Sequence, residues 1–321
     1  MAQRKTTKKK NRAGARKSAS PGSSFAKRAR QRVSEGTRKA ASASLARARN
    51  LGDEARRVIH PVDQGPPHIS LLKSPAGALP VVKMGTLFRV ASYNVHRWAG
   101  LNGRGKPDLT RAGSVIEALD ADIIALQEVL RPMGDESPLE DFAQDLGLHL
   151  AFAANRKHKR GELGNAILSR FPITTISVLD LLSSRIERRC ALAAGFDTGS
   201  GIFGLVATHL SLVDRTRRRQ VQMLLKHPQW NAGPAVLMGD MNAWRECKAS
   251  QSLEDTLHRH SNVDWPATFP ASRPILALDR IYSSGAKVVS ISAYDTPSAR
   301  RASDHLPVVA ELRLPASADS G

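Results

Sequence analysis

The chain has 321 residues, of which 41% are hydrophobic and 24% charged, and its formal net charge is +19 at pH 7. This length allows one large domain or two small ones, and the composition is ordinary for a soluble protein. Cys190 and Cys247 are too few and too far apart for a disulfide framework or a zinc site, and no run of about 18 apolar residues that could cross a membrane is present.

The positive charge is concentrated at the start of the chain. Residues 1–60 contain 18 Lys and Arg against 3 Asp and Glu, a net of +15, which leaves 30 against 26, or +4, for the rest. Residues 1–32 have almost no large apolar side chain and are predicted to be disordered, because they cannot bury enough surface to offset the entropy of ordering. The Ala- and Arg-rich stretch 33–59 favours a partly formed helix. We call residues 1–60 the basic tail.

The charge of the basic tail indicates a polyanionic partner. Binding to a nucleic-acid backbone releases counterions, and the absence of interleaved aromatic residues predicts contacts without base recognition. An anionic membrane attracts the same charges and is the alternative partner. A third interpretation is a solubilising tail without a dedicated partner, and no feature points to a protein partner.

The remainder divides into three segments. Five prolines between residues 61 and 80 predict an extended Pro-rich linker over 61–84. A regular pattern over 85–315 predicts the folded domain, and 316–321 are expected to form a flexible C-terminus. Because the start lacks the apolar core of a secretory signal, we expect a cytoplasmic protein, with nucleoid association as an alternative.

Strands outnumber helices in the folded domain. Apolar runs predict strands at 86–95, 120–129, 164–173, 189–197, 202–212, 235–242, 278–284, 287–295 and 306–314. Several connections are short enough for hairpins, which predicts an α/β (α+β) body of mixed sheets packed in layers. The segments 156–164 and 244–252 are interpreted as loops without a readable specificity code.

Helical patterns are predicted at 108–119, 137–147 and 214–227. The first begins at Asp108 or Thr110. The second has Ser137 as N-cap and Glu140 in position to complete a capping box. The third ends before Pro228.

Polar side chains recur at the ends of the apolar strands. They are Asn94, Glu128, His209, Asp240, Asn242, Asp279, Asp304 and His305. Strands provide rigid supports, and their ends can gather at one rim of a sheet. One such residue would be a turn or a cap, whereas the whole set predicts a site at that rim.

These residues lie in motifs that resemble a known family. "SYNVH", "LQEV", "GNAILSR", "ATHLSL", "GDMNA", "LDRIY" and "SDHLPVV" occur in this order over about residues 86–314. They resemble the endonuclease/exonuclease/phosphatase superfamily, which is typified by DNase I. The resemblance implies a four-layer sandwich of two packed mixed β-sheets flanked by helices. It also implies that 85–315 is a catalytic domain that hydrolyses a phosphoester with a divalent metal, usually Mg²⁺, with Mn²⁺ as an alternative.

The resemblance also implies roles for individual residues. Glu128 would be the principal metal ligand, assisted by Asn94, with Asp304 a ligand or a neighbour of the metal. This donor set suits Mg²⁺, a hard ion that takes oxygen ligands and keeps several waters. Asn94 could otherwise be a simple turn amide.

The remaining motif residues would act on water and phosphate. Asp240 would orient or deprotonate the attacking water, and Asn242 would help to hold that water or a phosphate oxygen. Asp279 would orient His305, whose other nitrogen would donate toward the phosphate, with His209 as a second donor. Asp279 could alternatively form a surface ion pair with its neighbouring arginine, and His209 could be a satisfied core histidine.

Two further residues match the family pattern near the substrate. Arg189 would contact the substrate phosphate. Glu187 would support Arg189 without contacting the substrate. The chain also departs from some relatives, because His96 stands where certain DNA-repair members carry an acid. The pattern expected of inositol-phosphate phosphatases is absent from 275–281.

The leading hypothesis is a Mg²⁺-dependent phosphodiesterase, or nuclease, that cleaves a nucleic-acid backbone. In it, the basic tail and four arginines of one helix (Arg215, Arg217, Arg218 and Arg219) contact the backbone without sequence preference. One alternative keeps the chemistry but acts on a phospholipid or a small phosphoester, with the tail on an anionic membrane. Another is a catalytically inactive nucleic-acid-binding protein. Endo- or exonucleolytic cleavage and oligomeric state stay open.

Overall fold

The computed structural model describes residues 65–77, 82–134, 137–181, 187–257 and 265–315. The basic tail, with its predicted helix, and the predicted flexible C-terminus lie outside the described residues. Among the described residues, no helix has both the length and the apolar character needed to span a bilayer.

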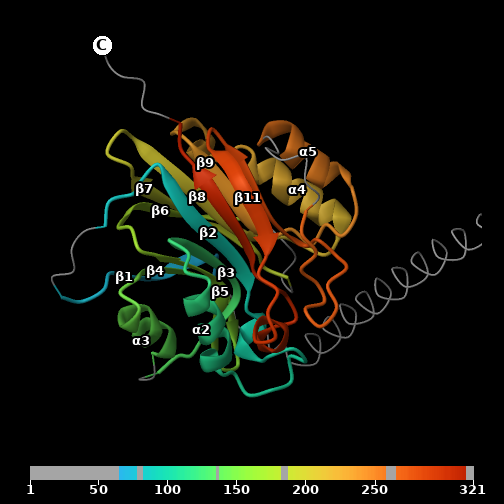
Figure 1. The fold of residues 1–321 in the computed structure, drawn as a ribbon. Coiled ribbons are helices and arrows are strands. Elements are labelled where there is room, and N and C mark those ends of the chain that lie inside the picture. Colours follow the sequence, from blue (N-terminus) through green and yellow to red (C-terminus); the bar gives the residue numbers. More distant parts are fainter. Residues whose placement is uncertain (1–64, 78–81, 135–136, 182–186, 258–264, 316–321) are drawn as a thin grey trace, which may run out of the picture. The chain divides into compact units, whose positions relative to one another are not determined.

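The described residues form two mixed β-sheets (Figure 1). The first has the order β1-β4-β5-β3-β2-β12-β11 and the second has the order β10-β9-β8-β7-β6. The strands of the first sheet are β1 (His68–Lys73), β2 (Leu87–Asn94), β3 (Ile123–Arg131), β4 (His149–His158), β5 (Gly161–Ser169), β11 (Lys287–Ala293) and β12 (Val308–Arg313). Those of the second are β6 (Ile173–Asp180), β7 (Cys190–Asp197), β8 (Ile202–His209), β9 (Ala235–Asp240) and β10 (Asp279–Ser284).

Helices cover the outer face of each sheet, which completes four layers. They are α2 (Leu109–Ala118), α3 (Pro138–Asp145), α4 (Asp214–Leu224), α5 (Lys248–Thr256) and α6 (Ala299–Ala302), with the 3-10 turns η1 (His96–Trp98) and η2 (Pro228–Asn231). In Figure 1, α2 and α3 lie beside the first sheet, whereas α4 and α5 lie beside the second. The predicted sandwich is therefore confirmed.

Three apolar clusters hold these layers together. One lies between the sheets and includes Phe88 of β2, Phe196 of β7 and Phe203 of β8, all buried. Another joins α2 and α3 to the first sheet, and the third joins α4 and α5 to the second. Because strands of the inner layers are covered on both faces, most consist of nearly continuous apolar runs, which is why the sequence pattern located them. The sequence analysis did not predict β4 and β6.

One segment predicted as linker belongs to the first sheet. His68–Lys73 form β1, an edge strand that pairs antiparallel with β4. The prolines that suggested a linker flank the strand without interrupting it, so that Ile69 and Leu72 remain available for pairing although they are exposed. The linker prediction is wrong for these residues.

Two other elements were interpreted as loops from the sequence. The segment 156–164 contains the end of β4 and the start of β5, and 244–252 contains the start of α5. The N-cap of α5 is Cys247, whose thiol accepts from the backbone while Ser250 Oγ accepts from the backbone N–H of Cys247 at 3.0 Å. Cysteine is outside the usual set of capping residues, which explains why the helix start carried no clear signal.

The two predicted N-caps have different outcomes. Asp108 caps α2, because its Oδ1 accepts from the backbone N–H of Thr110 at 3.0 Å. The capping box predicted for α3 is wrong, because the Ser137 side chain makes no capping hydrogen bond. Glu140 instead accepts from Arg131 of β3 at 2.7 and 2.8 Å, a charge-assisted pair that is stronger than a cap.

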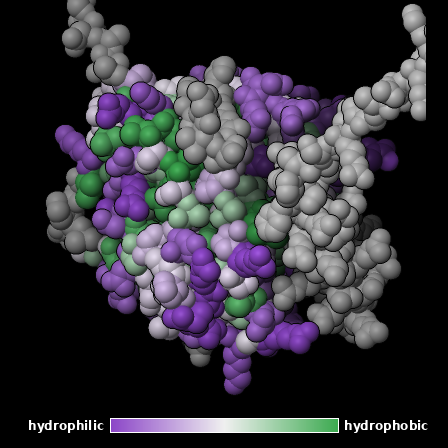
Figure 2. All heavy atoms as spheres, turned by 45° about the vertical axis from the view of Figure 1, so that its right-hand side comes forward, coloured by the Kyte–Doolittle hydropathy of each residue, from purple (hydrophilic) through white to green (hydrophobic). Residues whose placement is uncertain are grey.

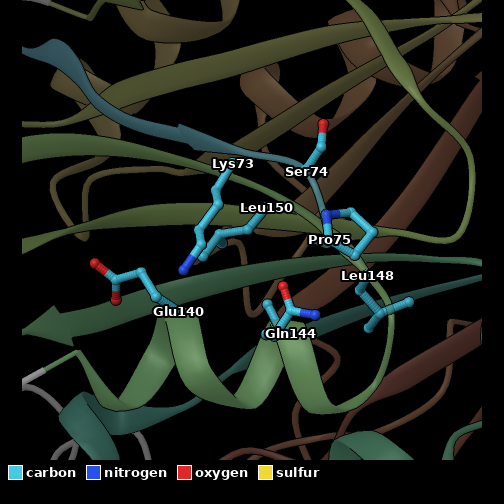
Figure 3. Close-up of a pocket in the computed structure, with 8 residues that line it drawn as sticks. Lys73, Ser74, Pro75, Glu140, Gln144, Leu148 and Leu150 are labelled. Carbon is cyan, nitrogen blue, oxygen red and sulfur yellow. The ribbon is translucent and has the colours of Figure 1, made fainter. Parts of the chain in front are cut away.

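A hollow of about 140 Å³ lies between the end of β1 and α3 (Figure 3). It is lined by Lys73, Ser74, Pro75, Glu140, Ala143, Gln144, Leu148 and Leu150. Gln144 Oε1 accepts from the backbone N–H of Ala76 at 2.7 Å, which ties the segment after β1 to α3. Leu150 pairs with Leu168, which pairs with Ile124 at the start of β3. None of the site residues predicted from the sequence lines this hollow.

Arg217 of α4 is a structural residue, which corrects its prediction as a backbone-binding side chain. It is 4% exposed, and its Nη1 donates to the carbonyl oxygens of Ser211 at 3.0 Å, Leu212 at 3.3 Å and Asn242 at 3.0 Å. Arg217 thus joins the loop after β8 to the loop after β9. Arg215, Arg218 and Arg219 of the same helix are exposed.

We expect Arg217→Ala to lower the free energy of unfolding by about 3 kcal/mol, because it leaves buried carbonyl oxygens without a donor. Arg218→Ala is the matched control on the same helix and should change stability by less than about 0.5 kcal/mol. Urea denaturation of the three proteins measures both values. Equal stabilities for the two variants would contradict the structural role of Arg217.

Candidate active site

Two pairs of parallel strands end at one edge of the sandwich. In the first sheet β2 runs parallel to β3, and in the second β8 runs parallel to β9. Asn94, His209 and Asp240 are the last residues of β2, β8 and β9. Asn94 Nδ2 donates to Asp240 Oδ2 at 3.1 Å, which connects the two sheets directly. The strand-end residues expected to meet at one rim therefore do so.

Asp240 is the buried centre of this arrangement, with 1% of its surface exposed. Its Oδ1 accepts from the backbone N–H of Asn242 at 2.9 Å. Its Oδ2 lies 3.3 Å from His209 Nε2 and 3.7 Å from His305 Nε2. Burial raises the pKa of Asp240 to about 7, although the charge of His305 acts in the opposite direction.

His209 is neutral and its tautomer follows from its partners. Arg189 Nη1 lies 2.8 Å from His209 Nδ1, and a guanidinium can only donate, so Nδ1 accepts. Nε2 then carries the proton and faces Asp240 Oδ2. Burial and the charge of Arg189 lower the pKa of His209 well below its ordinary value.

His305 has the opposite charge state. Burial lowers its pKa, but the carboxylates of Asp279 and Asp240 outweigh burial and raise the pKa well above its ordinary value. Asp279 Oδ2 accepts from Thr268 Oγ1 at 2.6 Å and lies 2.8 Å from His305 Nδ1. This fixes the ring with its Nε2 on the side of Asp240, and its centroid lies 4.9 Å from that of Phe269, with the two ring planes tilted by 49°.

Glu128 is an ionised carboxylate that is left free for a ligand. It is partly exposed and makes no hydrogen bond to a described residue, and Arg97 Nε lies 3.7 Å from its Oε2. Burial would raise the pKa of Glu128, but the positive charges of Arg97 and Arg189 act in the opposite direction, and its pKa lies well below its usual range.

Two further oxygen-bearing residues lie at the same edge as Glu128. Asn94 pairs with Gln127, the residue before Glu128. Ser303 Oγ donates to the backbone oxygen of Asn94 at 2.7 Å, which brings Asp304 to this edge as well. Asn94 Oδ1 accepts from one backbone N–H and keeps a second lone pair. This oxygen-only donor set fits a hard divalent cation.

A second group could also hold a metal by distance alone. One ligand atom each from Asp240, Asp279 and His305 lie within 4.8 Å of one another. In this group the charged imidazole offsets part of the negative charge, and Asp279 Oδ2 is already in contact with Thr268 and His305, although Asp279 Oδ1 has no partner among the described residues. Glu128 makes no hydrogen bond to a described residue with either oxygen and is therefore the better anchor for a cation.

Arg189 and Glu187 form a pair beside His209. Arg189 Nη2 donates to Glu187 Oε1 at 3.2 Å, and Glu187 Oε2 accepts from Ser211 Oγ at 2.9 Å. The pair orients the guanidinium that sets the tautomer of His209. Asp304 makes a different contact, with Oδ1 3.1 Å from His96 Nδ1.

Backbone strain is concentrated around this edge. Positive φ angles occur at His96 (46°), Arg97 (58°), Trp98 (59°), Glu128 (52°) and Asn242 (50°). Such angles are unfavourable for residues with a Cβ and persist only where the surroundings impose them, commonly at functional sites. At Asn242, the bond from its Nδ2 to the carbonyl oxygen of Leu210 at 2.8 Å helps to impose the angle.

The structure brings the sequence-predicted residues to one place and adds others. Asn94, Asp240, Asn242, His209, Asp279, His305, Arg189 and Glu187 are joined by contacts, and Glu128 and Asp304 lie at the same edge. Sequence reasoning missed Thr268, Ser303 and Ser211, which position Asp279, the segment before Asp304, and Glu187. Ser211 and Ser303 lie within the motifs "ATHLSL" and "SDHLPVV", whereas Thr268 lies outside all of the motifs. Their roles could not be predicted, because the partner of each hydroxyl group is remote along the chain.

Comparison with known proteins agrees with this geometry. Residues 91–305 match the model of the Endonuclease/Exonuclease/phosphatase family. The uncharacterized protein YbhP of Escherichia coli K12 is 30% identical over 253 residues, which cover 71% of this chain and 96% of YbhP.

Solved structures share the fold at low sequence identity. An endonuclease/exonuclease/phosphatase from Beutenbergia cavernae is 24% identical with a TM-score of 0.56, covering 71% of this chain and 72% of its own. A mannosyl-6-phosphatase of Bacteroides thetaiotaomicron (18%, 0.53) covers 70% of this chain and 99% of its own. D. rerio TDP2 complexed with a single-strand DNA product (13%, 0.53) covers 71% and 100%. The chain belongs to the endonuclease/exonuclease/phosphatase family, whose members are phosphoester hydrolases.

Proposed function

We propose that this protein is a divalent-cation-dependent phosphodiesterase that cleaves a nucleic-acid backbone. The observation that carries the hydrolytic part is the buried Asp240 carboxylate, held by Asn94 and Asn242 and flanked by one neutral and one charged histidine. A general base, a cationic donor and a free metal-binding carboxylate are what in-line attack of water on phosphorus requires.

Each group has a defined task in this proposal. Asp240 orients the attacking water and accepts its proton as the new P–O bond forms and the bond to the leaving oxygen breaks. His305, charged and oriented by Asp279, donates through Nε2 toward a phosphate oxygen, and Arg189 adds positive charge beside it. A cation on Glu128, Asn94 and Asp304 would supply Lewis-acid stabilisation of the developing negative charge.

The choice of nucleic acid as substrate rests on charge. The basic tail has a net charge of +15, and Arg215, Arg218 and Arg219 are exposed on the helix that follows the His209 loop. A cationic surface near the site raises affinity for a phosphate backbone at low salt. TDP2, which shares the fold, was solved with a DNA product.

One observation favours a phospholipid as second candidate. Leu212 and Val213, which follow His209, are 47% and 56% exposed, and Trp244, which follows Asn242, is 37% exposed. Arg217 joins these two loops. Hydrophobic residues also gather between hydrophilic ones on the face shown in Figure 2. Apolar side chains beside exposed arginines are suited to an anionic membrane.

A substrate panel separates these candidates. The full-length protein is assayed with Mg²⁺ on plasmid DNA, single-stranded RNA and anionic phospholipid vesicles, each with a chelator control. Turnover of nucleic acid alone supports the proposal, and turnover of lipid alone replaces it with the second candidate. Salt-dependent DNA binding without turnover of any phosphoester would favour the inactive binding protein. The complete set of site residues is an argument against that alternative.

We expect Asp240→Asn to lower kcat by roughly 10²- to 10⁴-fold, because the amide cannot accept the proton of water. Steady-state hydrolysis of the substrate identified by the panel measures this effect. Asp141→Asn, an exposed change of the same chemistry on α3, is the control and should retain wild-type turnover. Comparable activity of both variants would exclude Asp240 as the base.

We expect kcat/KM to rise with pH and to level off above about 7, because burial raises the pKa of Asp240 to about 7 and only the ionised carboxylate accepts a proton. Below that pKa the protonated form predominates, so each lower pH unit should reduce kcat/KM by about ten-fold. A pH–rate profile checks this. A flat profile between about pH 5.5 and 8 would contradict it.

We expect chelation to abolish turnover and added Mg²⁺ or Mn²⁺ to restore it. Glu128→Gln should raise the half-saturating metal concentration by about ten-fold or more, because the principal carboxylate is lost. A metal titration of activity measures this shift. Full activity in excess chelator would refute the proposed metal dependence.

A further inference from the structure

A guanidinium without a partner stands beside the site. Arg156, near the end of β4, is partly buried and makes no hydrogen bond or ion pair with any residue in the described parts of the chain. A partly desolvated guanidinium gains from pairing with a carboxylate or another anion, because removal of water from a lone charge is unfavourable. The position of Arg156 is therefore suited to an anionic ligand.

Strand register places Arg156 close to the metal-binding carboxylate. Arg156 pairs with Leu163 of β5, and Leu163 pairs with Leu130 of β3, two residues beyond Glu128. Burial lowers the pKa of Arg156, the charge of Arg189 lowers it further, and Glu128 raises it. These neighbours identify Arg156 as part of the same electrostatic environment as the site.

Arg97 lies beside the same carboxylate, Glu128, and comes from a different segment of the chain. It lies in the turn His96–Trp98, whose three residues all have positive φ. The turn is clamped by Trp98, which is 3% exposed and whose Nε1 donates to the carbonyl oxygen of Leu130 at 2.9 Å. Arg97 Nε, 3.7 Å from Glu128, is buried without a hydrogen bond. The strained backbone and a hydrogen bond of 3.1 Å from Arg97 Nη2 to His96 Nε2 hold this guanidinium beside Glu128.

The charges at this corner exceed what a single phosphodiester neutralises. Arg97, Arg156 and Arg189 are opposed by the carboxylates of Glu128, Glu187 and Asp304, and a divalent cation would add two positive charges. One phosphodiester contributes one negative charge. Arg189 contacts Glu187 and His209, whereas Arg97 Nε has no hydrogen bond and Arg156 makes none with a described residue.

We propose that Arg97 and Arg156 form a second phosphate-binding subsite, which takes a phosphate group of the substrate next to the one that is cleaved. The proposal rests on the hydrolytic function proposed above and narrows it to substrates with two neighbouring phosphates. Such a pair is found in a nucleic-acid strand and in a diphosphate ester, and the experiment distinguishes them. Planar guanidinium groups suit this role, because they bind phosphate oxygens in a bidentate manner.

Binding to the full-length protein is measured by calorimetry in excess chelator, with 5′-phosphorylated thymidine dinucleotide and inorganic pyrophosphate as probes. We expect Arg156→Gln and Arg97→Gln each to raise the Kd of one of these probes by about ten-fold, because a charge-assisted hydrogen bond is lost. The probe that responds identifies the source of the second phosphate. Arg160→Gln, an exposed change of equal charge in the same hairpin, should bind both probes as the wild type does.

Thermal unfolding distinguishes a role of Arg156 in ligand binding from a role in stability. Since Arg156 is an unpaired, partly buried charge, Arg156→Gln should leave the Tm equal to or above that of the wild type, and Arg156→Lys should recover part of the affinity. A lowered Tm with unchanged binding of both probes would assign Arg156 a structural role and overturn the proposal.

Kinetics with Mg²⁺ adds a test of specificity. The ratio of kcat/KM for the dinucleotide with its 5′-phosphate to that without it should fall about ten-fold in Arg156→Gln. An unchanged ratio overturns the subsite. If no substrate is hydrolysed by the wild type, the proposed function fails, whereas the chelator binding experiment still decides whether the subsite exists.

Discussion

The hydrogen bond between Asn94 and Asp240 is the contact on which the rest of the site depends. Asn94 ends β2 in one sheet and Asp240 ends β9 in the other, so the bond fixes how the two sheets meet at this edge. Both side chains are almost fully buried, and a buried polar group without its partner would be costly. The same Asp240 oxygen faces both histidines, so the geometry of the site follows from the packing of the sheets.

The two histidines have opposite charge states for reasons visible in their partners. His209 accepts from an arginine and is kept neutral by burial and by that charge, whereas His305 lies between two carboxylates and is kept charged. Both face Asp240, whose burial places its pKa near neutrality. One carboxylate, one neutral ring and one charged ring thus share a small volume, an arrangement typical of sites that move protons at neutral pH.

Positively charged side chains and strained backbone angles are concentrated around Glu128. The left-handed turn at His96–Trp98 and the positive φ of Glu128 impose positions that the chain would not choose locally. Arg97 Nε lies 3.7 Å from Glu128 without a hydrogen bond, and Arg156, two strands away, makes none with a described residue. A protein that retains strain and unpaired charges at one place loses stability there, and binding of an anionic ligand is the ordinary compensation.

The sequence by itself determined most strands of the inner layers, although not β4 and β6, because continuous apolar runs can be recognised without knowledge of their neighbours. It also determined the motif residues at the ends of these strands. It did not locate the edge strand β1, the cap of α5 or the buried role of Arg217, since these depend on pairing or on carbonyl groups remote along the chain. Only the tertiary structure decided which nitrogen of His209 carries the proton and that Arg156 makes no hydrogen bond with a described residue. Such properties arise from distances between segments, for which a local sequence pattern contains no information.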